Sequence, residues 1–138
     1  MSLSYHCPKC DCLLNPNVRV VLVASFGDKQ GIVLMSSQPG DYQVICDMGL
    51  CHDVSKGDII EFRCPVCHAS LTSGAHENFA ELKVVNSAKS EHGPCLLRFS
   101  RISEEHATFL YDGQSVKEFG EEAGLFRQEM TIEGDWGW

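Results

Sequence analysis

The chain lacks the features that mark several large classes of protein. It has no run of 18 apolar residues, no apolar segment typical of a signal peptide and no Asn-x-Ser/Thr glycosylation acceptor, which argues against a membrane-spanning or secreted protein. It also has no GxGxxG, phosphate-loop or GxSxG motif, which argues against the nucleotide-binding and hydrolase sites that use them. We therefore expect a cytoplasmic protein, without membrane association, whose cysteines are reduced.

Basic residues are scarce in the last quarter of the chain. Residues 103–138 carry nine acidic side chains against two basic ones, whereas residues 1–102 carry ten against nine. A nearly neutral body has no extended positive field to hold a phosphate backbone. Lys9, Arg19 and Arg63 could form only a small basic spot, so binding to duplex nucleic acid is not favoured.

Two short segments repeat one pattern of cysteine and proline. They are Cys7-Pro8-Lys9-Cys10 and Cys64-Pro65-Val66-Cys67. Proline fixes φ after the first cysteine of each turn and leaves the next amides free to point at the sulfur. Two such turns, called knuckles below, supply four thiolates for a tetrahedral metal site. We therefore predict that Cys7, Cys10, Cys64 and Cys67 bind one metal ion, although 53 residues separate Cys10 from Cys64.

In the two knuckle segments, residues 6–12 and 62–71, the chain resembles the zinc-ribbon superfamily, which shares its knuckle geometry with rubredoxins. The resemblance implies a metal ion and a local fold, not an activity. Rubredoxins usually carry glycine after the second cysteine of each knuckle, where this chain has Asp11 and His68, so we favour one structural Zn²⁺ per chain over iron. Four cysteines fill the coordination shell, so His6 and His68 are expected beside the thiolates or in solvent, and no catalytic residue is predicted.

The rest of the chain predicts a mostly β fold, because short β-branched runs bounded by turn residues recur every eight to twelve residues. Between the knuckles we expect one sheet whose ends bring the knuckles together, with strands at 18–26, 32–35, 42–46 and 59–62 and a hairpin loop at 27–31. After the second knuckle we expect an antiparallel meander over 80–119 that packs as a second sheet, with strands at 80–86, 95–102, 107–111 and 114–119 and a tight turn at Asp112-Gly113. Residues 1–119 would then form one zinc-ribbon β-domain.

Alternation within the predicted strand at 80–86 indicates which side chains face the core. Ala80, Leu82 and Val84 share one face, and Glu81 and Lys83 share the other. This is the pattern of a half-buried strand, with the two charged side chains on the solvent side.

Most of the remaining cysteines are expected to be structural, and the remaining histidines are expected at the surface. The segment Cys46-Asp47-Met48-Gly49-Leu50-Cys51-His52 has the crowding of a metal site, and with Cys12 or Cys95 it could form a second centre. Its spacing is not that of a knuckle, and Cys46 shares a strand face with Tyr42 and Val44, so a buried thiol is favoured there. Structural thiols are likewise favoured at Cys12 and Cys95. Surface positions are expected for four histidines, His52, His76, His92 and His106.

Residues 120–138 form an acidic tail that contains both tryptophans of the chain, Trp136 and Trp138. One or two helical turns are expected over 120–130, with Leu125, Phe126 and Met130 as a small apolar patch. Exposed indoles are unfavourable in water, so the tryptophans are expected either to fold back onto the body or to dock on a partner.

Together these features favour a non-catalytic zinc-binding β-domain that acts as a protein-interaction or regulatory module and contacts a protein through its tail. A dimer formed by pairing of exposed strand edges is a further option. Two alternatives stay open. One is a zinc-ribbon protein associated with nucleic acid or the ribosome, because similar ribbons are frequent in transcription and translation. The other is a thiol-based redox or metal-dependent enzyme that uses Cys46, Cys51 or the knuckle cysteines.

Overall fold

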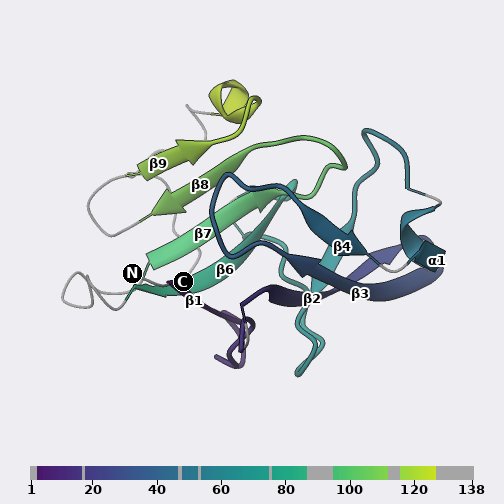
Figure 1. The fold of residues 1–138 in the computed structure, drawn as a ribbon, viewed down its shortest axis with the longest axis horizontal. Helices are drawn as coiled ribbons and strands as arrows, with labels where there is room; N and C mark the ends of the chain where they lie inside the picture. Colours follow the sequence, from purple (N-terminus) through teal and green to yellow (C-terminus); the bar gives the residue numbers. More distant parts are fainter. Residues whose placement is uncertain are drawn as a thin grey trace.

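The computed structural model describes residues 3–16, 18–46, 48–52, 54–74, 76–86, 95–111 and 116–126. These residues form two antiparallel sheets (Figure 1), which confirms the predicted mostly β fold. The five-stranded sheet has the order β1-β6-β7-β8-β9, and the four-stranded sheet has the order β4-β3-β2-β5. The strands are β1 (Leu3–His6), β2 (Val20–Phe26), β3 (Lys29–Met35), β4 (Val44–Cys46), β5 (Glu61–Arg63), β6 (Phe79–Asn86), β7 (Cys95–Ser100), β8 (Thr108–Tyr111) and β9 (Val116–Phe119); the two short helical segments are α1 (Met48–Cys51) and η2 (Ala123–Phe126). In the described part of the chain, no helix has the length and apolarity needed to cross a membrane.

The four strands between the knuckles pair in one sheet, as predicted. β2 lies between β3 and β5, and its inward-facing side chains Val20, Leu22 and Ala24 are buried. The β2–β3 connection is tighter than the predicted loop, because Phe26 already pairs with Lys29. Gly27 adopts a φ of 62° in this two-residue turn, a conformation that matches the twist of the flanking strands.

The strands after the second knuckle form the predicted meander, since β6, β7, β8 and β9 are successive neighbours. Ala80, Leu82 and Val84 face the main core and are buried. The predicted turn at Asp112-Gly113 lies outside the described residues. Figure 1 shows η2 close to β9, at the edge of this sheet.

Glu81 departs from the expected solvent face, because its side chain is buried. Its carboxylate lies 2.8 Å from Nε of Arg98 on the neighbouring strand. A second, smaller core explains the burial, since Phe109, Tyr111 and Ala123 pack together on this side of the sheet. A charge placed in such surroundings requires a partner of opposite charge.

The first residues of the predicted tail pack onto this second core. Phe126 of η2 contacts the ring of Phe79, with centroids 5.0 Å apart, and the ring of His76, with centroids 5.8 Å apart. Leu125 is 75% exposed, so it does not join Phe126 in a buried patch. Three residues named for the tail, Met130, Trp136 and Trp138, lie outside the described residues.

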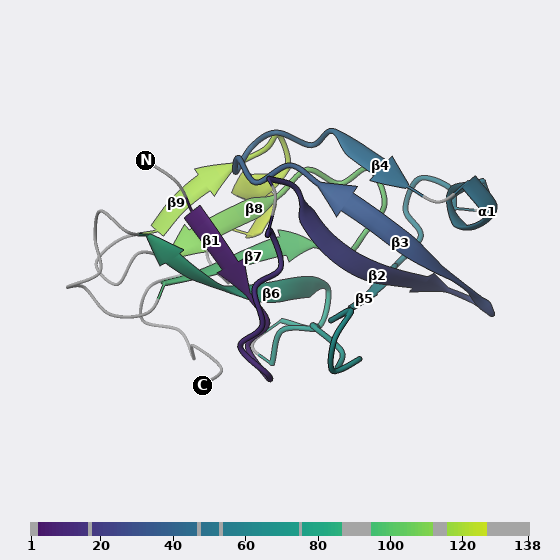
Figure 2. The ribbon, with the colours of Figure 1, turned by 60° about the horizontal axis from the view of Figure 1, so that its bottom comes forward.

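Strand β1 is not predicted by the sequence patterns, and it changes how the knuckles are positioned. β1 pairs with β6, with Leu3 opposite Asn86, so the chain enters the first knuckle from the five-stranded sheet and leaves it into β2 of the other sheet. The second knuckle does the reverse, from β5 to β6. The strands between the knuckles bring them together from one sheet, as predicted, but the outer end of each knuckle joins the five-stranded sheet, so each knuckle lies where the chain crosses between sheets. Figures 1 and 2 show the two knuckle segments side by side below the sheets.

Candidate metal centre

The two knuckles have the same backbone structure. In the first, the amide of Asp11 donates to the carbonyl of Cys7 at 2.8 Å; in the second, the amide of His68 donates to the carbonyl of Cys64 at 3.0 Å. The amides two and three positions after each first cysteine donate to its sulfur, at 3.3 and 3.4 Å in both knuckles. These contacts confirm the arrangement predicted for a proline-containing turn, and N–H donors of this kind stabilise a thiolate.

Asp11 and His68 both occupy the left-handed region of backbone conformation, with φ of 65° and 63°. Glycine is the residue that adopts this conformation without steric cost, while aspartate and histidine tolerate it better than most. The turn therefore has the same backbone requirement with or without glycine. It follows that the absence of glycine at these positions does not distinguish zinc from iron.

The four predicted cysteines lie close together, with all four sulfur atoms within 4.8 Å of one another. The sulfurs of Cys7 and Cys67 are 3.8 Å apart, and those of Cys10 and Cys64 are 3.7 Å apart. In a regular tetrahedron with metal–sulfur bonds of about 2.3 Å, the sulfurs are separated by about 3.8 Å. The cluster therefore has the dimensions of a four-thiolate metal site.

The first and second cysteines of each knuckle differ in exposure. Cys7 and Cys64 are fully buried and belong to the main core, whereas Cys10 and Cys67 are exposed. One half of the cluster is thus fixed by core packing, and the other half is open to solvent. An ion or a chelator can reach the site from the side of Cys10 and Cys67.

For each of the two buried thiols, Cys7 and Cys64, burial raises the pKa and the hydrogen bonds from backbone amides lower it. Burial raises the pKa of Cys7, and the backbone amides that donate to its sulfur only partly offset this. Burial also acts to raise the pKa of Cys64, but its backbone amide donors and the neighbouring thiols of Cys12 and Cys10 outweigh it and lower that pKa. Cys64 therefore loses its proton more readily than Cys7, and binding of a cation displaces protons from the rest of the cluster.

Cys12 lies at the edge of the cluster without belonging to it. Its sulfur is 3.4 Å from that of Cys64, but it is not one of the four cysteines that surround a common centre. Burial, with the hydrogen bond to Cys64, raises the pKa of Cys12, which suits an S–H donor to the Cys64 sulfur. Sequence spacing gives no hint of this contact, because Cys12 follows the knuckle instead of forming part of it.

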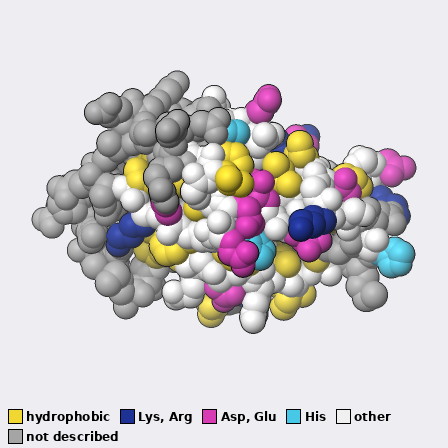
Figure 3. Space-filling view, turned by 90° about the horizontal axis from the view of Figure 1, so that it is seen from above, with side chains coloured by type: hydrophobic (Ala, Val, Ile, Leu, Met, Phe, Trp, Pro, Cys, Tyr) yellow, Lys and Arg dark blue, Asp and Glu magenta, His cyan; other side chains and the backbone are white. Residues whose placement is uncertain are grey.

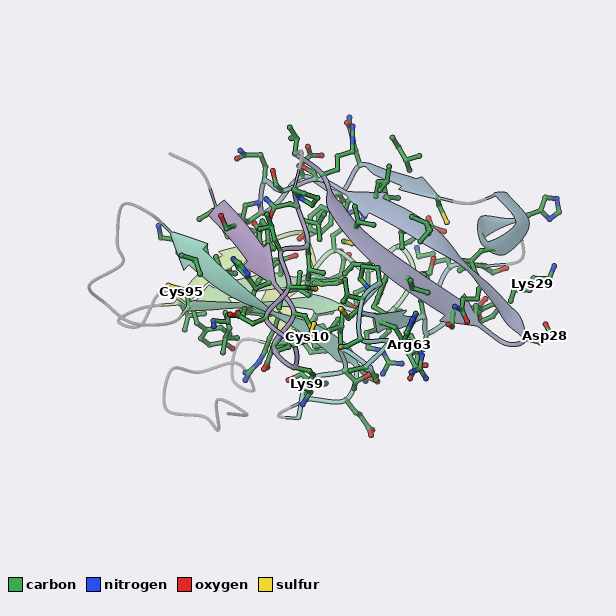
Figure 4. All side chains as sticks on the ribbon, turned by 90° about the horizontal axis from the view of Figure 1, so that it is seen from below. Lys9, Cys10, Asp28, Lys29, Arg63 and Cys95 are labelled. Carbon is green, nitrogen blue, oxygen red and sulfur yellow. The ribbon has the colours of Figure 1, made fainter. Side chains whose placement is uncertain are left out.

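A second metal centre is not present among the described residues, where the four-cysteine cluster is the one group with the required proximity. Cys46 is disulfide-bonded, which corrects the predicted free thiol at this position. The side chain of Cys51 lies outside the described residues. Cys95 is buried at the start of β7 and lies well away from Cys10 (Figure 4).

The described histidines differ in their surroundings. His6 lies beside the first knuckle, as expected, with Nδ1 3.1 Å from the carbonyl oxygen of Asp11. His52 is exposed. The other two described histidines that were expected at the surface are partly exposed and also make ring contacts: His106 stacks on Tyr42 at 4.3 Å, and His76 packs on two phenylalanine rings.

Two of the cations near the knuckles are neutralised by carboxylates. Arg63 lies 2.7 Å from Glu61 and also donates to the carbonyl of His68 at 2.9 Å. Lys83 lies 2.9 Å from Asp11. Figure 4 shows Lys9 and Arg63 on the lower side of the molecule, in separate positions.

Comparison with known proteins gives no match, since no family model, no curated protein and no solved structure is significantly similar to this chain. The functional conclusion therefore depends on the geometry of the four cysteines and on the surfaces around them.

Proposed function

We propose that the protein is a non-catalytic β-domain held together by one structural Zn²⁺, with Cys7, Cys10, Cys64 and Cys67 as ligands, and that it acts as a protein-interaction or regulatory module. One observation carries the proposal: four cysteine sulfurs within 4.8 Å of one another lie where the chain crosses twice between the sheets.

A structural role for the ion follows from the ligand set. Four thiolates fill a tetrahedral shell and leave no position for water or substrate, whereas a catalytic zinc keeps such a position open. The ion would join a turn that leaves the five-stranded sheet to a turn that leaves the four-stranded sheet. Metal binding and folding would therefore be coupled, because the site forms only when the two sheets are in contact.

An apolar strip on the outer face of the four-stranded sheet supports a role in protein interaction. It consists of Val21, Ile32, Leu34 and Ile45, with Leu34 paired to Val21 on one side and to Ile45 on the other. Ile32 and Ile45 are 47% and 54% exposed. Contiguous exposed apolar side chains of this kind mark surfaces that bind other proteins. The tryptophans of the tail would supply a second contact.

Elemental analysis tests the metal site. The purified chain is expected to carry one zinc per molecule, and the Cys67→Ser variant is expected to carry much less. Cys95→Ser is the matched control, because Cys95 is buried away from the site and its loss should leave the zinc content at one. A full-length protein without stoichiometric metal, or a Cys67→Ser variant with normal metal content, would contradict the proposal.

A double substitution tests the interaction surface separately. Ile32→Glu with Ile45→Glu should leave the zinc content and melting temperature unchanged and abolish the capture of protein partners by the tagged chain. Val18→Glu is the control, since Val18 is 69% exposed and is not part of the apolar strip. If the double variant captures the same partners as the unmodified chain, the strip is not the contact surface.

A further inference from the structure

A cavity of about 280 Å³ lies between the two sheets. Its walls are apolar side chains from both sheets, among them Ala24 and Val33 from one and Leu82, Leu97 and Phe99 from the other. These five residues are buried members of the main core. An engineered cavity of about 150 Å³ with similar walls binds benzene. The larger space here is suited to an apolar body of about two fused rings.

Two chain segments border the cavity on its solvent side. They are residues 36–43 between β3 and β4, and residues 100–106, which comprise the last residue of β7 and most of the connection to β8. Tyr42 joins the first segment to the five-stranded sheet. Its hydroxyl donates to the carbonyl of Phe119 at 3.1 Å and lies 2.8 Å from Oγ1 of Thr108. Its ring stacks on His106 of the second segment. The entrance is therefore fixed by contacts within the protein before any ligand binds.

Glycine at position 120 permits this anchoring. Gly120 has a φ of 97°, and an added Cβ would lie 2.5 Å from the hydroxyl oxygen of Tyr42. The backbone thus approaches Tyr42 more closely than any other residue type allows.

Carboxylates predominate among the charged side chains at the entrance. Asp41, Glu104 and Glu105 line the cavity, and Arg101 is the one lysine or arginine among its lining residues. The guanidinium of Arg101 donates to the backbone carbonyls of Ile60 and Glu77, so two of its donors are engaged within the protein. Figure 3, which views the molecule from above, shows acidic side chains gathered around a histidine and flanked by hydrophobic ones.

We propose that this cavity binds a small molecule that has an apolar body of about two rings and carries a protonated amine. The body lies between the sheets, in contact with Val33 and Leu97, and the ammonium group lies at the entrance near Asp41 and Glu104. Burial of the apolar body provides most of the affinity, and the carboxylates select for positive charge over negative. The proposal does not depend on the identity of the metal.

Three probes with one body and three charges test the proposal on the full-length, metal-loaded chain. They are 2-naphthylmethylamine, 2-naphthylmethanol and 2-naphthoate. Isothermal titration calorimetry is expected to give a dissociation constant on the order of 100 μM for the amine, from the usual affinity per atom of small ligands. The alcohol should bind about threefold more weakly and the carboxylate more weakly still, since a partly exposed ion pair adds little. Raising the salt concentration should reduce the difference.

Two adjacent residues of β3 give a matched pair of variants. Val33→Phe places a larger side chain in the cavity and so fills part of it, whereas Ile32→Phe places the same larger side chain on the outer face, where Ile32 is exposed. Val33→Phe should weaken binding of the amine at least tenfold, while Ile32→Phe should leave it unchanged. The Asp41→Asn variant keeps the walls intact and should bring amine and alcohol closer in affinity.

Several results would overturn the proposal. They are the absence of binding by any probe, tighter binding of the carboxylate than of the amine, and equal binding by the Val33→Phe and Ile32→Phe variants. Melting temperature and zinc content, measured on each variant, show whether it is folded. If Val33→Phe is not folded, Leu97→Met provides a milder change of the wall, and unaltered amine binding by that variant and by Asp41→Asn counts against the site.

Discussion

Replacement of Arg98 by methionine should destabilise the protein strongly, because it leaves a buried carboxylate without its cation. Nε of Arg98 lies 2.8 Å from Oε1 of Glu81, and the two side chains are 3% and 7% exposed. Glu81 also accepts a hydrogen bond from the hydroxyl of Ser73 at 3.1 Å, which cannot replace a full charge. Removing one partner of a buried ion pair costs about 3–5 kcal/mol. For a chain of this length that corresponds to a decrease in melting temperature of about 10–15 °C.

Urea denaturation of the metal-loaded protein measures this loss. Lys117→Met is the control, because Lys117 is exposed on β9 and its replacement should change the free energy of unfolding by less than about 0.5 kcal/mol. The double variant Glu81→Leu/Arg98→Met removes both charges and should recover at least about 2 kcal/mol, since an apolar pair of similar volume is often neutral. The reasoning is refuted if Arg98→Met loses less than about 1 kcal/mol, or if the double variant is no more stable than the single one.

Three further predictions concern the metal centre. Removal of the ion by a chelator at neutral pH should lower the melting temperature by more than about 10 °C, and added Zn²⁺ should restore it, because the free energy of metal binding contributes to the free energy of folding. Differential scanning calorimetry measures both changes. An unchanged melting temperature after proven metal removal would contradict the structural role. The Cys12→Ala variant should keep one zinc per chain by elemental analysis, since its sulfur contacts Cys64 from outside the four-cysteine group; loss of the zinc would make Cys12 a ligand. His68→Gly should raise the free energy of unfolding by up to about 1 kcal/mol, because His68 has a φ of 63°, a conformation that glycine adopts without steric cost. His68→Val should lower the free energy of unfolding. If urea denaturation gives the opposite order, contacts of the His68 side chain outweigh the steric cost of its backbone conformation.

The knuckles could be predicted from the sequence because their structure is local. Each depends on a cysteine, a proline and the amides of the next few residues, and the second copy confirms the pattern of the first. The four sulfurs lie together, as the repeated pattern indicates. The strand pattern is also informative, because alternation in the segment around Leu82 identifies the side chains that face the main core.

The features that the sequence did not predict depend on contacts between distant residues. β1 has four residues, and its partner β6 lies some 80 positions along the chain, so no local pattern marks it as a strand. Burial of Glu81 depends on the small core that Phe109 and η2 build over the outer face of its sheet. Cys46 lies on the predicted strand, but a sequence pattern does not report the disulfide that it forms.

Because the knuckles lie at both crossings between the sheets, the four sulfurs lie at the junction that connects the two sheets. Figures 1 and 2 place the knuckle segments together on one side. The two connections that border the cavity begin after Met35 and at Ser100, which pair with the first residues of the strands that follow the knuckles, Val20 and Phe79. An ion held by the knuckles would fix the angle between the two sheets. That angle would in turn affect the width of the cavity between them. Loss of the ion would therefore change the volume available to a ligand, even though none of the four knuckle cysteines lines the cavity.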